Sequence, residues 1–144
     1  MHDDNVRVTA AVVHHPPIAP AFAYRFDAED RSIVISGDTT PSESLVALAR
    51  NADILVHEAL FDAASVDRLV VHVPNASDLR RSILSHHTTA EEAGRIAAEA
   101  QVGTLVLSHL IPSDDPFVTE AMWRDAAGKH FGGRIIVGRD LMEL

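Results

Sequence analysis

Histidine and carboxylate side chains recur in this sequence at the points where predicted strands end. His15 closes the first alternating apolar segment, Asp38 follows the third strand pattern, and His109 follows a later one. The pair His57-Glu58 comes directly after another apolar run. Imidazole nitrogens and carboxylate oxygens are ligands of zinc, manganese and iron. Because ligands bind at the carboxyl ends of strands in α/β sheets, the pattern predicts one divalent metal site built from distant parts of the chain.

The segments that would carry these residues read alternately as strands and helices. Strand patterns cover residues 6–12, 22–26, 32–36, 53–56, 104–107 and 134–137. A helix is expected to begin at an N-cap Thr40, a second at a capping box after His87, and a third over residues 116–130. Residues 62–85 give no clear pattern beyond a short helix after Asn75. The alternation predicts a single α/β layered domain over residues 1–144.

Composition excludes several classes of function. The chain has 144 residues, of which 47% are apolar and 23% charged, so it should fold as one domain. Cysteine is absent, which excludes thiolate catalysis and cysteine-bound zinc. No apolar run reaches membrane-spanning length and the first residues lack a signal-peptide pattern, so we expect no membrane partner and a cytoplasmic location. The net charge of −9 argues against coating nucleic acids.

Four short segments together resemble motifs of the metallo-β-lactamase superfamily, in its ribonuclease Z and arylsulfatase-like branch. They are Ile-Ser-Gly-Asp-Thr at 35–39, Leu-Val-His-Glu-Ala at 55–59, His-Thr-Thr-Ala-Glu-Glu-Ala at 87–93 and Leu-Val-Leu-Ser-His-Leu at 105–110. Their order along the chain is that of the family. The resemblance implies a metal-dependent hydrolase.

The resemblance also implies the metal ligands. His15 matches a ligand of the first metal, with His14 as the alternative if the loop aligns one residue earlier. Asp38 matches the aspartate that bridges both metals, and His109 matches a ligand of the second. The implied cofactor is a divalent metal at two ions per complete site, with zinc expected first and manganese or iron as alternatives.

Three further residues match catalytic positions of the family. His87 matches the histidine that donates a proton to the leaving oxygen, and His57-Glu58 matches the element that orients it. An imidazole with a pKa near 6.5 suits this role, and a neighbouring carboxylate would hold its tautomer. The family element continues with a threonine, whereas this chain has Leu60, which removes one expected supporting hydrogen bond.

The family signature His-x-His-x-Asp-His does not occur in the chain. The resemblance therefore implies half of an αββα sandwich, the C-terminal half, with a mixed β-sheet and helices packed on one face. Each metal would keep only two of its usual side chains, so we expect weak or no metal binding and an incomplete hydrolase in isolation. The uncovered face of the sheet should be apolar, which favours a homo-oligomer or a missing N-terminal half as partner.

The substrate class stays open between phosphodiesters, sulfate esters and related small esters. Because the chain is acidic and has no basic cluster, we expect a small-molecule ester substrate and no nucleic acid. The alternative function is a non-catalytic oligomerising or partner-binding module that keeps the fold without a full metal site. A phosphate-receiver module is disfavoured, because the only lysine, Lys129, lies in a predicted helix.

Overall fold

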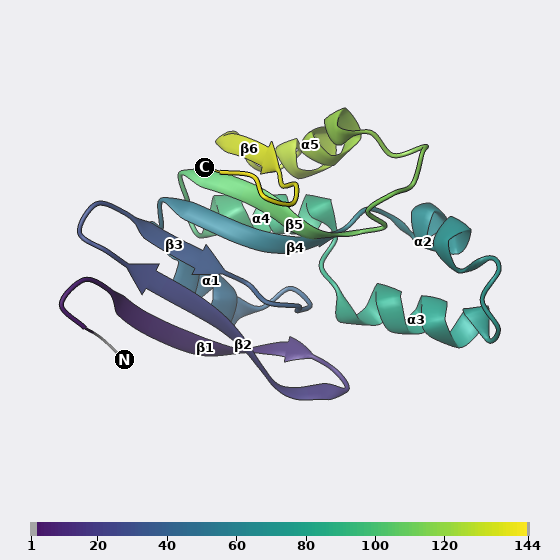
Figure 1. Ribbon diagram of the computed structural model, residues 1–144, viewed down its shortest axis with the longest axis horizontal. Coiled ribbons are helices and arrows are strands. Elements are labelled where there is room, and N and C mark those ends of the chain that lie inside the picture. The colour runs from purple at the N-terminus through teal and green to yellow at the C-terminus, as the bar shows by residue number, and fades with distance from the viewer. Residues whose placement is uncertain (1–2, 144) are drawn as a thin grey trace.

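A computed structural model describes residues 3–143, which form a six-stranded sheet in the order β1-β2-β3-β4-β5-β6 (Figure 1). The first three strands pair antiparallel, and β3 to β6 run parallel to one another. The strands are β1 (Arg7–His15), β2 (Ile18–Asp27), β3 (Ser32–Ile35), β4 (Ile54–Leu60), β5 (Thr104–Ile111) and β6 (Arg134–Val137). The predicted α/β class and mixed sheet are confirmed.

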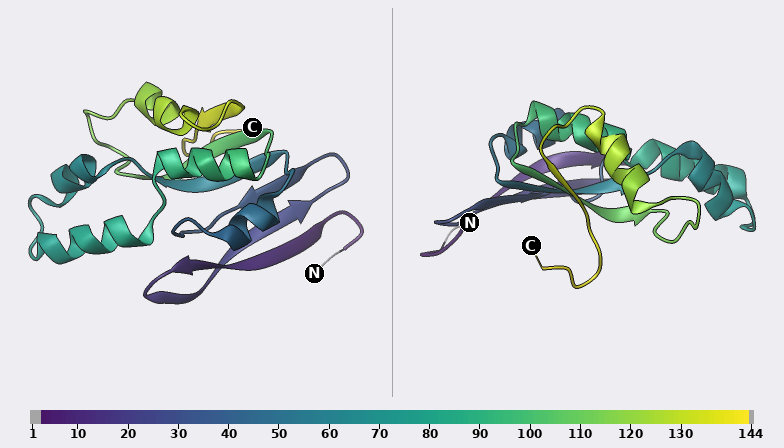
Figure 2. Two further views of the ribbon diagram at one scale, coloured as in Figure 1. Left: turned by 180° about the vertical axis from the view of Figure 1, so that it is seen from behind. Right: turned by 90° about the horizontal axis from the view of Figure 1, so that it is seen from above.

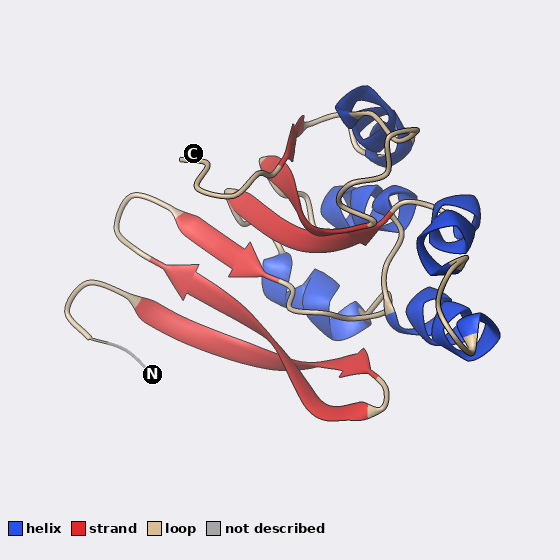
Figure 3. Cartoon of the chain, turned by 45° about the vertical axis from the view of Figure 1, so that its right-hand side comes forward, coloured by secondary structure: helices blue, strands red, loops and turns tan. Residues whose placement is uncertain are grey.

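Helices occupy one face of this sheet and one of its ends. The helices are α1 (Glu43–Ala49), α2 (Ala63–Val70), α3 (Ala76–His86), α4 (Ala90–Glu99) and α5 (Glu120–Gly128). Figure 2 shows α1, α4 and α5 on the same side of the sheet, whereas α2 and α3 extend beyond its end, as Figure 3 also shows. The sequence left residues 62–85 mostly unassigned, and the structure forms two short helices there.

The core lies between the sheet and the three covering helices. Leu45 of α1, Ile96 of α4 and Trp123 of α5 pack there with Leu55 and Leu105 of the sheet. Helices α4 and α5 approach closely at Gly94, where a Cβ atom would lie 2.1 Å from the carbonyl oxygen of Ala127. Small residues on α4 therefore permit this packing, and each apolar side chain buried there stabilises the fold by about 1.5–3 kcal/mol.

The opposite face of the sheet is open and apolar. Val12, Phe22, Tyr24 and Ile35 are 61, 39, 42 and 43% exposed, and the strand register puts all four on this face. We call this set the open face. The predicted uncovered apolar surface is therefore present. Within residues 3–143, no helix is both long and apolar enough to cross a bilayer.

The predicted start of the first helix was wrong. Helix α1 begins at Glu43 with Ser42 as its N-cap, three residues after Thr40. Thr40 instead donates its backbone N–H to the carbonyl oxygen of His14 at 2.8 Å. This long-range bond to the end of β1 satisfies the Thr40 amide outside a helix, so the loop after β3 stays extended and reaches the edge of the sheet where the polar residues gather.

Candidate metal centre

Asp38 lies in a tight loop whose backbone requires glycine at the preceding position. The preceding residue, Gly37, has a φ of +60°, and a Cβ atom there would lie 2.7 Å from the carbonyl oxygen of Phe22. Left-handed backbone combined with this close approach excludes other residues. Beyond Asp38, the backbone N–H of Thr39 donates to Glu58 Oε1 at 3.1 Å. The loop is thus held from both sides, and this fixes the position of the Asp38 carboxylate.

The two oxygens of Asp38 face two different histidines. His15 Nε2 lies 4.0 Å from Oδ2, and His109 Nδ1 lies 3.7 Å from Oδ1. His15 is oriented by its other ring nitrogen, which donates to the carbonyl oxygen of His86 at 2.9 Å and leaves Nε2 toward Asp38. A carboxylate placed between two imidazoles in this way can contact two cations at once.

His109 projects from a bulge at the end of β5. Glu58 pairs with Ser108 and Ala59 pairs with Leu110, so His109 has no partner in the ladder. Its φ of +43° lies in the left-handed region, which is strained for a residue with a Cβ atom. The bulge turns the side chain out of the sheet's alternation and leaves it 54% exposed beside Asp38.

His87 and Glu58 form a largely buried pair beside these residues, in which Glu58 is buried and His87 is 12% exposed. His87 Nδ1 lies 3.1 Å from Glu58 Oε1, and the same oxygen accepts the backbone N–H groups of Thr39 and Thr88, each at 3.1 Å. The hydrogen bond to Glu58 raises the pKa of His87 above its usual value. Because Nδ1 is engaged, the free nitrogen of His87 is Nε2.

The position before α4 explains how His87 is held. A capping box joins Thr89 to Glu92, and the Thr88 hydroxyl donates to the carbonyl oxygen of Thr39 at 2.6 Å. The backbone N–H of Leu60 donates to the carbonyl oxygen of Thr88 at 2.8 Å. Main-chain bonding therefore supports this element although Leu60 replaces the family's threonine.

Two of the predicted site residues point elsewhere. The His14 side chain is exposed, and this residue meets the site loop only through its backbone. His57 is completely buried on the same face of β4 as Leu55, and its Nδ1 donates to the carbonyl oxygen of Glu58 at 2.7 Å. Burial lowers the pKa of His57, so its ring is neutral. Of the predicted ligands and catalytic residues, the structure gathers His15, Asp38, Glu58, His87 and His109.

These donors fit a divalent metal. Asp38, His87 and His109 each offer one ligand atom, and the three atoms lie within 4.8 Å of one another. Two nitrogens with one carboxylate oxygen suit zinc, manganese or iron. The place of His87 in this group did not follow from the sequence, where it matched only a proton donor.

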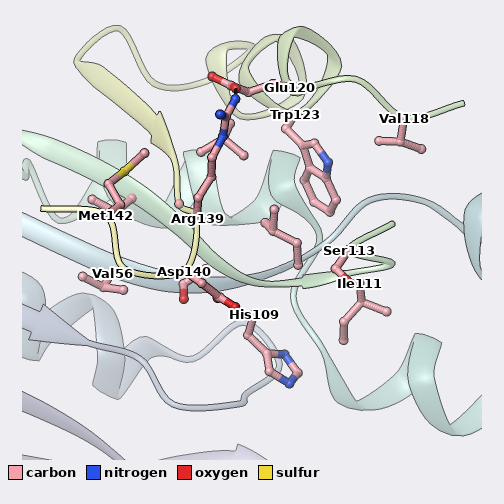
Figure 4. A pocket seen from close by; sticks show the side chains of 15 residues that line it. Val56, His109, Ile111, Ser113, Val118, Glu120, Trp123, Arg139, Asp140 and Met142 are labelled. Atoms are coloured by element: carbon pink, nitrogen blue, oxygen red, sulfur yellow. Dashed lines mark hydrogen bonds and ion pairs between the residues drawn. The ribbon is translucent and has the colours of Figure 1, made fainter. Parts of the chain in front are cut away.

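A cavity of about 760 Å³ adjoins His109 (Figure 4). Trp123 and Glu120 line it from α5, and Arg139 from the segment after β6. Its lining also includes Val56 and Val106, which the strand register places on the same side of the sheet as Ile35. The cavity is therefore lined both from the open side of the sheet and from α5, and it reaches His109 at the metal-ligating edge.

Comparison with known proteins adds sequence relatives. The chain is 36% identical over 138 residues to ribonuclease Z of Mycobacterium tuberculosis H37Rv, covering 96% of the chain and 48% of that protein. It is 35% identical over 140 residues to ribonuclease Z of Mycobacterium avium, covering 96% and 46%. No family model matches the chain.

Solved structures share the fold. The metallo-beta-lactamase fold protein YhfI from Bacillus subtilis superposes with a TM-score of 0.71 at 24% identity, covering 96% of this chain and 49% of that one. The short form of human tRNase Z superposes with a TM-score of 0.61 at 23% identity, covering 99% and 42%. These structures show that the chain has the metallo-β-lactamase fold. Its sequence matches the ribonuclease Z branch of the metallo-β-lactamase superfamily over 96% of the chain.

These findings confirm the predicted family of metal-dependent hydrolases and correct the predicted partner. The expectation of a small-molecule ester substrate and no nucleic acid was wrong, because the relatives are ribonucleases. The error came from the net charge of −9, which sums surface charges far from the site and ignores bound cations. The chain also spans about half the length of the curated relatives it matches. Zinc as the metal and a homodimer stay predictions.

Proposed function

We propose that this chain is the C-terminal half of a metal-dependent phosphodiesterase that cleaves RNA, with tRNA as the substrate class. The observation that carries the proposal is the convergence of Asp38 and His109 with the Glu58–His87 pair at one sheet edge. Similarity to ribonuclease Z over 96% of the chain supports the choice of an RNA phosphodiester.

The metal ligands in this proposal are His15, Asp38 and His109. Asp38 presents one carboxylate oxygen to each histidine, which is the arrangement required to serve two neighbouring cations. Divalent metals held there would lower the pKa of a bound water, so that it can attack phosphorus at neutral pH. Cations at this edge would also attract phosphate despite the acidic composition of the chain.

His87 supplies the proton for the leaving oxygen in this proposal. Glu58 fixes the ring through Nδ1, which leaves Nε2 as the free ring nitrogen. The pair is nearly closed to water, because the His87 and Glu58 side chains are 12 and 2% exposed. The hydrogen bond from Glu58 raises the pKa of His87 and favours the protonated ring that a general acid requires.

The open face of the sheet packs, in this proposal, on the remainder of a longer protein. The exposed side chains of this face, Val12, Phe22, Tyr24 and Ile35, form an apolar patch of the kind that marks a protein interface. The matched relatives are about twice as long as this chain, so an equally large partner segment is available in proteins of this branch.

A chimera tests this function directly. The 138 matched residues of M. tuberculosis ribonuclease Z would be replaced by this chain, and cleavage of an RNA substrate of that enzyme would be measured. We expect cleavage by the chimera and at least about a hundredfold lower rate for its His87→Ala variant. The matched control is His72→Ala, an exposed histidine between α2 and α3, which should leave the rate unchanged.

Two results would overturn the proposal. One is a folded chimera that binds metal and does not cleave RNA, which would favour the non-catalytic module. The other is full cleavage by both the His87→Ala and the Asp38→Ala variants, which would place the chemistry outside this half.

A further inference from the structure

We infer that this chain alone, with no ligands from another protein segment, binds one divalent transition metal through Asp38, His87 and His109. In that state His87 is a metal ligand. The inference concerns the metal site alone and holds whether or not the longer protein cleaves RNA. It replaces the expectation that each metal keeps only two side chains of this chain.

The first support is the grouping of the ligand atoms. One atom each of Asp38, His87 and His109 lies within 4.8 Å of the other two. The rings of His87 and His109 are stacked with centroids 5.7 Å apart and an interplanar angle of 20°. Three protein ligands with one position left for water is a usual arrangement for catalytic zinc, whereas two ligands are too few.

The second support is the way His87 is held. Histidines that bind metals donate their other ring N–H to a carboxylate or carbonyl, which fixes the tautomer and raises the basicity of the ligating nitrogen. His87 Nδ1 lies 3.1 Å from Glu58 Oε1, and that carboxylate is itself fixed by the amides of Thr39 and Thr88. The ring is therefore preorganised to offer Nε2 to a cation.

His15 occupies a different place. Its Nε2 faces Oδ2 of Asp38 at 4.0 Å, whereas His109 faces Oδ1. Among the described residues, His15 is not part of the three-residue group. Its ring meets that of His87 edge-on, with centroids 5.1 Å apart, but its Nε2 faces the second carboxylate oxygen, so we assign it to a second ion.

The arrangement has a consequence for the proposed proton transfer. The nitrogen that would protonate a leaving oxygen is the same Nε2 that would bind the metal. His87 can perform only one of these tasks at a time. We therefore expect the metal-loaded chain alone to hold His87 in a state that cannot donate a proton, until other ligands take over the ion.

Calorimetric titration of the 144-residue chain with Zn²⁺ tests the inference without any substrate. We expect one zinc per chain. His87→Ala and His109→Ala should each weaken binding by more than about 100-fold, which exceeds the 10–100-fold loss typical of a residue that only supports a ligand. His15→Ala should weaken it by less than about tenfold, and the exposed control His72→Ala should not change it.

A second variant and an NMR spectrum distinguish the loss of a ligand from misfolding of the variant. His87→Asn keeps an N–H donor for Glu58, because its amide nitrogen takes the place of Nδ1, and it removes the ligating imidazole nitrogen, so it should fold and still lose the site. The ¹⁵N spectrum of the histidine rings should show Nε2 of His87 shifting when zinc is added. Absence of zinc binding, a His15→Ala variant that loses it, or an unshifted His87 would each overturn the inference. Failure of RNA cleavage by the chimera would not.

Discussion

Two pairs of polar residues at the same sheet edge differ in how they are held. Glu58 is buried and His87 is only 12% exposed, and one carboxylate oxygen of Glu58 accepts three hydrogen bonds. Asp38 and His109 are 39 and 54% exposed, and their nearest atoms are 3.7 Å apart, beyond hydrogen-bond distance. One oxygen of the buried pair's carboxylate is fully hydrogen-bonded within the fold while Oε2 has no partner there. The exposed pair is positioned by its backbone and lacks a partner that a cation would provide.

The largest effect is expected where the buried pair is broken. Glu58→Ala removes the acceptor of the Thr39 and Thr88 amides and of His87, which leaves buried donors unsatisfied. We expect the free energy of unfolding to fall by about 3–5 kcal/mol in urea titrations. Glu58→Gln keeps one acceptor oxygen and should lose less than half as much. Equal losses in the two variants would show that packing, and not hydrogen bonding, holds this pair.

The next effect depends on pH and comes from His57, the buried histidine that precedes Glu58. Burial keeps His57, next to Glu58, neutral in the folded state, with a pKa below its usual 6.5. The unfolded chain takes up a proton there below pH 6.5, so the unfolded state binds more protons and stability falls as the pH falls. We expect wild-type stability to fall by up to about 1.4 kcal/mol per pH unit more than that of His57→Asn. Parallel curves for the two proteins between pH 6.5 and 5 would contradict the assignment.

The local parts of this site could be predicted from the sequence, and the long-range parts could not. The capping box of Thr89 with Glu92 needs only residues three positions apart, and the structure forms it. The alternation of strand and helix was enough to bring Asp38 and His109 to one edge, because parallel strands end on the same side.

The rest depends on contacts that no local pattern encodes. The bond of Glu58 to His87 spans 29 positions and decides which ring nitrogen is free. The bulge that turns His109 outward arises from a shifted register between β4 and β5. Thr40 shows the same limit. Its backbone N–H donates to the carbonyl oxygen of His14, 26 residues earlier in the chain, and this bond replaces the helix start that the local sequence predicts.

A smaller effect is expected from the strained backbone of the exposed pair. Both His109→Ala and His109→Gly remove the imidazole, and glycine alone accepts a φ of +43° without strain. We expect the glycine variant to be more stable than the alanine variant by about 1 kcal/mol in thermal unfolding. If alanine is the more stable of the two, the left-handed conformation at this bulge is not a cost to the fold.

The smallest effect on metal-free stability is expected at Asp38, the carboxylate of the exposed pair. Because Asp38 is 39% exposed and meets its histidines at 3.7 and 4.0 Å, Asp38→Asn should change metal-free stability by less than about 0.5 kcal/mol. With zinc at about 100 times its dissociation constant, the wild type should gain about 2.7 kcal/mol, and the variant should gain none. Stability measured with zinc and with a chelator gives both numbers. A large loss of stability in Asp38→Asn without metal would mean that Asp38, like Glu58, stabilises the fold. It would contradict the assignment of this edge as a metal site.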